Sequence, residues 1–181
     1  MSSWTIPAEY SGILPKIRVL LLGPYRGKFL KRMANLRTYF ITEYNMGNCR
    51  IVADFNTPQK RNDETNGQYN LRKSLYWISH ADILFYIYFD GADNAGVQRE
   101  LGETFILLPD CAWRVILAYH PNVSTLVEEY HDTMREISIV PFSNIGELKR
   151  NGFGPIENLL RRFYYRVDRR LDGEWENSRV Q

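Results

Sequence analysis

Two glutamates, Glu100 and Glu103, follow a small polar turn in the stretch FDGADNAGVQRELGETF, which covers residues 89–105. The turn comes directly after the apolar run ILFYIYF at residues 83–89, which has the composition of a buried strand. A carboxylate that emerges at such a strand end can face a ligand. Its anionic oxygen can attack or stabilise an electron-poor carbon.

The helical pattern after the turn separates Glu100 from the buried residues. If a helix begins near residues 94–96, Val97, Leu101 and Phe105 form its buried stripe, and Glu100 lies off that stripe in the second turn. Helical side chains lean toward the N-terminus, so Glu100 is expected to point back at the strand edge. Acids in first turns also stabilise helix ends by about 0.3–1 kcal/mol. The pattern alone leaves both roles open.

Apolar segments alternate with helical patterns along most of the chain. The expected strands are Ile17–Leu22, Arg50–Phe55, Ile83–Phe89, Trp113–Tyr119 and Ile137–Pro141. The expected helices are Lys28–Tyr44, a helix carrying Leu71, Leu75 and Ile78, and then Gly96–Leu108, Ser124–Arg135 and Pro155–Arg170. This alternation predicts an α/β fold, a flavodoxin-like or Rossmann-like three-layer sandwich. Its sheet has five parallel strands in the order 2-1-3-4-5.

The length of 181 residues suits one domain. This domain is expected over residues 16–170, between an N-terminal lead at 1–15 and a polar, frayed tail at 171–181.

The polar segment 57–70 is expected to be a loop, which is either a lid or a plain connection. Basic clusters at 26–37 and 161–170 fit solvated helix faces.

Composition excludes several classes of function. A net charge of +2 is too small for the dense positive field that nucleic-acid binding needs, so no nucleic-acid partner is expected. The two cysteines have no metal-ligand spacing, which argues against a zinc site or a disulfide framework. The N-terminus lacks a signal-peptide pattern, and no apolar run approaches the length of a membrane span, so a cytoplasmic, soluble protein without membrane contact is predicted.

The fold predicts where a ligand would bind. In open parallel sheets ligands bind beyond the carboxyl ends of the strands, where the strand order reverses. Two turns should meet there, GPYRGK at residues 23–28 and DGADNAG at residues 90–96. Arg26 and Lys28, together with the N–H groups that open the next helix, could hold a phosphate, unless they are ordinary exposed residues.

The sequence Gly96-Val97-Gln98-Arg99-Glu100-Leu101-Gly102 resembles the GxxxE(I/L)G signature of the nucleoside 2-deoxyribosyltransferase-like superfamily. The strand that starts with Ala81-Asp82 and the first strand, which ends in Gly23-Pro24-Tyr25, also agree in order and spacing with that superfamily. The superfamily includes deoxynucleoside monophosphate N-glycosidases, and TIR-like NAD hydrolases are more remote relatives. The resemblance covers about residues 16–170 and is strongest in the two glycine turns.

The resemblance implies that Glu100 attacks C1′ of a sugar and forms a covalent glycosyl-enzyme, which a second base or water then releases. It implies a small-molecule nucleotide or nucleoside as partner, no metal or organic cofactor, and a homodimer. The residues expected to line the sugar-phosphate end are Gly23, Pro24, Tyr25, Arg26, Asn94 and Gly96. Ser74 stands where the family usually has an aspartate, so the acid that assists the leaving group is unassigned.

Other polar and aromatic residues are weaker candidates. Asn94 stands where transferases carry an aspartate that binds a sugar hydroxyl, with Asp93 one residue earlier, and the neutral Asn94 would repel a phosphate less. His120 ends the fourth strand and could supply a proton. Tyr69 or Trp77 could stack on a base.

Three other functions compete with the deoxyribosyltransferase-like activity. One is a non-catalytic nucleotide sensor that uses the same cleft, which Ser74 favours. Another is a TIR-like NAD glycohydrolase. The third, a dinucleotide-dependent oxidoreductase with Asp54 on the ribose, is disfavoured because GPYRG does not match the GxGxxG fingerprint.

Overall fold

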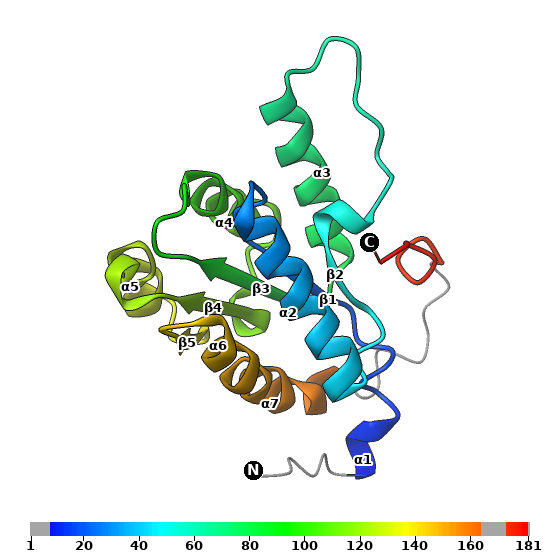
Figure 1. Ribbon diagram of the computed structural model, residues 1–181, viewed down its shortest axis with the longest axis vertical. Helices are drawn as coiled ribbons and strands as arrows, with labels where there is room; N and C mark the ends of the chain where they lie inside the picture. Colours follow the sequence, from blue (N-terminus) through cyan, green and yellow to red (C-terminus); the bar gives the residue numbers. More distant parts are fainter. Residues whose placement is uncertain (1–7, 164–172, 181) are drawn as a thin grey trace.

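The computed structural model describes residues 8–163 and 173–180, and its centre is a five-stranded parallel sheet (Figure 1). The strands are β1 (Val19–Leu22), β2 (Cys49–Ile51), β3 (Ile83–Tyr88), β4 (Val115–Tyr119) and β5 (Ser138–Pro141). Their order is β2-β1-β3-β4-β5, and every neighbouring pair is parallel. The predicted fold class and strand order are therefore confirmed.

Helices cover both faces of this sheet. They are α1 (Ala8–Ser11), α2 (Lys28–Tyr44), α3 (Asn66–His80), α4 (Ala95–Leu107), α5 (Thr125–Thr133), α6 (Ile145–Asn151) and α7 (Phe153–Phe163). Short 3-10 turns occupy Val52–Asp54, Ala112–Arg114 and Pro121–Val123. Buried side chains of α2, α6 and α7 pack on one face of the sheet, and those of α3, α4 and α5 pack on the other.

The alternation of side chains along each strand divides the core into these two halves. In β1, Val19 and Leu21 face α2, whereas Leu20 and Leu22 face α3 and α4. All four residues of β1 and all six of β3 are buried. Burial on both faces explains why these segments are apolar throughout rather than alternating. Within the described residues, none of the helices is long and apolar enough to cross a membrane.

The second strand is shorter than the predicted Arg50–Phe55, because the chain turns into a 3-10 helix after Ile51. The Asp54 carboxylate causes this turn by accepting the Ile51 N–H at 2.9 Å. Its other oxygen pairs with the Arg37 guanidinium, and both side chains are almost fully buried. Arg37 thus lies in the interior, which corrects the expectation of a solvated face for that residue of the 26–37 cluster.

The expected loop at 57–70 ends earlier than predicted, because α3 already begins at Asn66. The Thr65 hydroxyl accepts the Gln68 N–H at 3.2 Å, and the Gln68 side chain accepts the Thr65 N–H at 2.9 Å. This is a capping box, whose T-x-x-Q pattern was visible in the sequence. The remaining loop and the first turns of α3 extend beyond the body of the molecule (Figure 1).

The expectation of a frayed chain after Leu171 is wrong for residues 173–180, which pack against the start of β1 and β2. The Trp175 side chain is fully buried, and its indole N–H donates to the Asn48 carbonyl at 3.0 Å. The Arg18 guanidinium binds both oxygens of Glu176 at 2.9 and 3.1 Å. The sequence analysis also missed α1 and α6, and residues 164–170 of the predicted last helix lie outside the described residues.

Candidate active site

A cavity of about 620 Å³ lies at the carboxyl-terminal edge of the sheet, between the turn after β1 and the first turns of α4. It brings together the two glycine turns, as the sequence predicted. The β1–α2 turn contributes residues 23–29, α3 contributes Gly67, Asn70 and Leu71, and the α4 side contributes Asp93, Gly96, Val97, Arg99 and Glu100. Of the expected lining residues, Gly23, Pro24, Tyr25, Arg26, Lys28, Asp93, Gly96 and Glu100 are all present.

Glu100 forms part of the inner wall of this cavity and is only 8% exposed. Its Oε2 atom is buried and has no hydrogen-bond partner in the described part of the chain, and no ion pair there involves its carboxylate. Burial raises the pKa of this carboxyl from 4.5 to about 7, and a hydrogen bond from the Ser74 side chain lowers it in part. Ser74, on α3, therefore lies beside Glu100.

The tyrosine side chains of Tyr25 and Tyr88 lie close enough to the Glu100 carboxyl to be affected by its charge. The Tyr25 hydroxyl donates to the Leu21 carbonyl at 2.8 Å, and burial, followed by the Glu100 charge, raises the pKa of Tyr25 well above its ordinary value. The Tyr88 hydroxyl is buried without a partner among the described residues. Burial also raises the pKa of Tyr88, with smaller contributions from Tyr130 and Glu100.

A hydrogen-bond chain fixes the backbone of Glu100 against the sheet. The Thr104 hydroxyl donates to the Glu100 carbonyl at 2.7 Å and lies 2.6 Å from the Tyr86 hydroxyl. Since Thr104 uses its own hydrogen toward Glu100, the Tyr86 hydroxyl is the donor between those two. All three residues are buried, so this chain ties α4 to β3 at the level of the candidate nucleophile.

Two glycines of the cavity serve different purposes. At Gly23, an added Cβ would lie 2.8 Å from the Met33 sulfur and 3.3 Å from the Ile87 carbonyl, so a larger residue there would have to displace the Met33 side chain. At Gly96 an added Cβ would meet nothing within 4 Å. The missing side chain at Gly96 therefore widens the cavity rather than relieving a contact, which fits a backbone that a ligand approaches closely.

Three cationic side chains stand at the rim. Arg26 and Lys28 are exposed in the first turn, and Arg99 is exposed on α4. The N-cap residue of α2, Gly27, has no side chain with which to bond the first N–H groups of that helix. Sequence reasoning missed Arg99, although its spacing of three residues from Gly96 places both on one side of the helix.

Asp93 and Asn94 differ from the expected arrangement. Asn94 is buried under the turn and its side-chain N–H donates to the Phe89 carbonyl at 2.9 Å, so it holds the turn and does not line the cavity. The side chain at the cavity is that of Asp93, whose Oδ1 accepts the Ala95 N–H at 3.1 Å. The cavity thus keeps a carboxylate at its rim, where sequence analysis expected a neutral amide to reduce repulsion.

The two aromatic candidates lie outside the lining of the cavity. Trp77 is 1% exposed, stacks on Phe55 at a centroid distance of 3.7 Å and donates its indole N–H to the Thr57 carbonyl at 2.6 Å. It is a core residue, unlike the base-stacking surface that was expected. Tyr69 packs beside the Arg72 guanidinium on α3.

The histidine candidate also lies outside the lining. His120 uses its ring Nδ1 to accept the Asn122 N–H at 3.2 Å and thereby caps the turn after β4. Within the described residues, no three His, Cys, Asp or Glu side chains gather closely enough to hold a metal ion.

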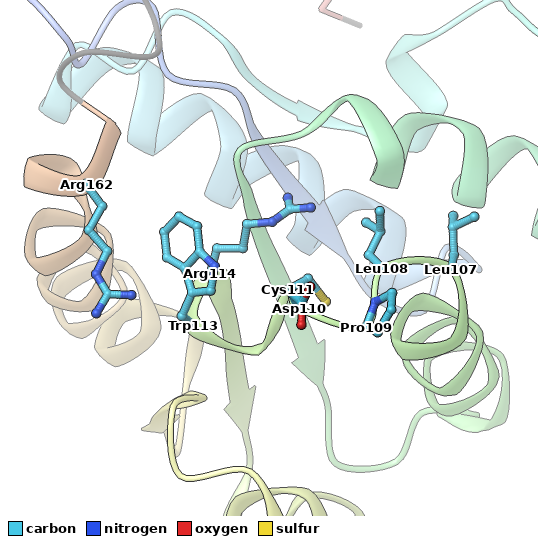
Figure 2. A pocket seen from close by; sticks show the side chains of 8 residues that line it. All are labelled: Leu107, Leu108, Pro109, Asp110, Cys111, Trp113, Arg114 and Arg162. Atoms are coloured by element: carbon cyan, nitrogen blue, oxygen red, sulfur yellow. The ribbon is translucent and has the colours of Figure 1, made fainter.

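A larger hollow of about 740 Å³ lies at the opposite edge of the sheet, before β4 (Figure 2). Trp113, Arg114 and Arg162 line one side of it, and the segment 107–111 after α4 lines the other. The Arg114 guanidinium donates to the Ala81 carbonyl at 2.7 Å, so this side chain is already hydrogen-bonded to the protein backbone. This hollow lacks both glycine turns and Glu100, and the smaller cavity remains the candidate site.

No family model matches the chain, and no curated protein or solved structure matches it either. The function is therefore argued from the residues of the cavity themselves.

Proposed function

We propose that this protein cleaves or transfers the N-glycosidic bond of a nucleotide or nucleoside, with Glu100 as the nucleophile. The observation that carries this proposal is the position of the Glu100 carboxyl. It lies in the wall of a nucleotide-sized cavity, and among the described residues one of its oxygens has no hydrogen-bond partner and no cation pairs with it. A carboxylate with a structural role would instead be locked in an ion pair or turned toward solvent.

The chemistry follows from that position. The ionised carboxylate attacks C1′ of the bound sugar, a C1′–O bond forms, and the C1′–N bond breaks with its electron pair going to the base. Water or a second base then releases the sugar from Glu100. The low-polarity surroundings that raise the Glu100 pKa leave the carboxylate poorly solvated, which favours attack on a carbon that develops positive charge.

The rim of the cavity supports a phosphorylated substrate. Arg26 and Lys28 lie beside the uncapped N-terminus of α2, where N–H groups and the helix dipole attract anions. On the opposite side, the Asp93 carboxylate can accept a hydrogen bond from a sugar hydroxyl. These groups would place the sugar between the two turns, with C1′ toward Glu100.

The test measures release of free base from a panel of nucleotides and nucleosides by chromatography, for the wild type, Glu100→Gln and Glu103→Gln. Glu103 belongs to the same helix and does not line the cavity. We expect release by the wild type and Glu103→Gln, and a loss of at least about 1,000-fold in Glu100→Gln. A 2-fluoro sugar analogue should leave a covalent adduct that peptide mass analysis places on Glu100.

The pH dependence adds a second criterion. Because the nucleophile must be ionised and its pKa is raised to about 7, kcat/KM should increase as the pH rises through about 7. If Glu100→Gln releases base as fast as the wild type, Glu100 is not the nucleophile. If no variant releases base but nucleotides raise the melting temperature, the cavity is a binding site without catalysis and the proposal fails.

A further inference from the structure

We infer that the substrate of this site is a nucleoside 5′-polyphosphate, a di- or triphosphate whose outer phosphates lie beside Phe29 between the Lys28 and Arg32 side chains. This inference rests on the proposed function and names the substrate class. It is carried by a group of cations at the beginning of α2 that have no ionic partner among the described residues and adjoin the cavity that contains Glu100.

Two of these cations are held beside the cavity by aromatic rings. Phe29 is buried and lines the cavity. The Lys28 Nζ atom lies 5.2 Å from the centre of the Phe29 ring, and the Arg32 Cζ atom lies 5.4 Å from the same centre. Arg32 Cζ also lies 5.9 Å from the ring centre of Phe89, the residue that follows β3. Ring faces attract cations at such distances, so both charges are in place before a ligand binds.

The electrostatics of α2 disfavour these two cations in the absence of an anion. Lys28 is the first residue of the helix, where the positive end of the helix dipole repels a cation, and the first turn contains no acid. Arg32 lies one turn later, and like charges at this spacing repel each other. The chain has no Asp or Glu from residue 26 to residue 42. An anion bound beside Phe29 would offset all of this repulsion.

Protein carboxylates do not neutralise this group of cations. Within the described residues, the side chains of Arg26, Lys28 and Arg32 form no hydrogen bond and no ion pair. Arg37, further along the same helix, instead binds the buried Asp54 carboxylate. The three cations at the beginning of α2 thus differ from a structural arginine of the same helix. Cations in this state are available to phosphate oxygens, which arginine binds through two parallel bonds.

The carboxylates of the turn after β3 are engaged by protein donors. The Asp90 Oδ2 atom accepts the Asn122 side-chain N–H at 3.0 Å, and the Asp93 Oδ1 atom accepts the Ala95 N–H at 3.1 Å. Among the described residues, neither carboxylate forms an ion pair with a cation of α2. The beginning of α2 therefore keeps its positive charge next to this turn.

The cations extend further than a monophosphate can reach. In the proposed orientation C1′ of the sugar lies at Glu100, and the 5′ end points toward α2. There Arg26, Lys28 and the first N–H groups of the helix bind the first phosphate. Arg32 does not line the cavity and lies one helical turn beyond Lys28. A monophosphate leaves Arg32 without an anion, whereas a second and a third phosphate extend past Phe29 and bring negative charge to it.

The binding experiment uses Glu100→Gln, so that the substrate is not consumed. Isothermal titration calorimetry in EDTA compares the mono-, di- and triphosphates of each common ribo- and deoxyribonucleoside. EDTA removes divalent cations that would otherwise neutralise the phosphates. We expect the tightest-binding nucleoside to bind at least about tenfold more tightly as its triphosphate than as its monophosphate. Inorganic tripolyphosphate should displace this nucleotide at a lower concentration than inorganic phosphate does.

Variants then locate the contact. Arg32→Met keeps an apolar side chain over Phe29 and Phe89 but removes the charge. It should lower the affinity for the triphosphate about fivefold and that for the monophosphate by less than about twofold. Arg32→Lys keeps the charge and should retain most of the preference for the triphosphate. Arg150→Met changes an exposed arginine on α6 outside the cavity and is the matched control, which should keep the full preference.

Ionic strength provides a further criterion. Because salt screens exposed charges, the preference for the triphosphate should decrease when the NaCl concentration is raised from about 50 to about 500 mM. A preference that is the same at both salt concentrations would overturn the assignment of the outer phosphates to Lys28 and Arg32.

The outcomes separate this inference from the proposed function. Equal affinity for mono- and triphosphates, or an equal effect of Arg32→Met and Arg150→Met, would overturn the polyphosphate assignment. Base release from monophosphates that depends on Glu100 would in that case leave the proposed function standing. Preferred binding of triphosphates without base release by the wild type would identify the polyphosphate as a ligand and refute catalysis. A lack of binding by every nucleotide would count against both.

Discussion

Replacing Glu100 by Gln should make the protein more stable at neutral and alkaline pH. The folded protein raises the pKa of this carboxyl from 4.5 to about 7, so the native state holds its proton more tightly than the unfolded chain does. The folded state therefore loses stability relative to the unfolded chain as the pH rises from 4.5 through 7. Glutamine resembles the protonated acid and avoids this loss.

The size of the effect follows from the two pKa values. They differ by about 2.5, and each pH unit corresponds to 1.36 kcal/mol, so the loss amounts to about 3 kcal/mol above about pH 8. Glu100 is 8% exposed, so screening by solvent is small. Below about pH 4.5 the carboxyl is protonated in both states, and wild type and variant should have nearly the same free energy of unfolding.

Urea unfolding of the wild type and Glu100→Gln at a series of pH values between about 4 and 9 measures this difference. Glu103→Gln removes the same charge from α4 outside the cavity and reports the effect of net charge alone. A difference between wild type and Glu100→Gln that does not change with pH would refute the reasoning. So would a variant less stable than the wild type at about pH 8.5, because it would show that the ionised carboxylate is stabilised in the fold.

Two further predictions concern the interior. Trp175→Ala removes a fully buried side chain and the hydrogen bond to Asn48. It should lower the free energy of unfolding by about 3–5 kcal/mol in urea titrations. An unchanged urea midpoint of unfolding would show that residues 173–180 do not pack on the sheet. Asp54→Asn leaves the buried Arg37 guanidinium without its carboxylate and should cost about 3–5 kcal/mol by the same measurement. Arg37→Met combined with Asp54→Leu should recover part of that loss, and a double variant less stable than Asp54→Asn would contradict this account.

The sheet could be predicted from the sequence because its strands are buried on both faces. Runs such as Ile83–Tyr88 are apolar at every position, and the pattern of α2 matched its observed bounds of Lys28–Tyr44. The alternation with helices predicted a parallel sheet with right-handed crossovers, and the order 2-1-3-4-5 was expected as the flavodoxin-like arrangement of such a sheet. Local sequence patterns of this kind therefore predict most of the architecture.

Features that depend on distant partners were harder to predict. The segment 50–55 is a reasonable strand by composition, but Asp54 binds the backbone of Ile51 and the side chain of Arg37, and so ends the strand early. Trp175 lies in a polar stretch whose composition suggests fraying, but it packs against Phe55 and Trp77 and donates a hydrogen bond to the Asn48 carbonyl.

The candidate site was predictable to a similar extent. The two turns and Glu100 could be placed because they follow the carboxyl ends of β1 and β3. Asp93 lines the cavity in place of Asn94 because the Asn94 side chain donates hydrogen bonds to the Phe89 and Ala92 carbonyls, and the sequence pattern does not reveal these bonds. Arg99 was missed because it lines the cavity together with residues of α3. The hydrophobic periodicity of a helix does not reveal which other helix packs beside it.

The position of Trp175 has a consequence for the order in which the molecule can form. All five strands precede it in the sequence, so the sheet is fully synthesised while Phe55 and Trp77 still lack the indole that covers them. During that interval the aromatic pair of the nascent chain is exposed to water. Chaperones recognise exposed apolar surface of this kind. Trp175 thus completes the apolar layer against which α3, and with it one wall of the cavity, packs.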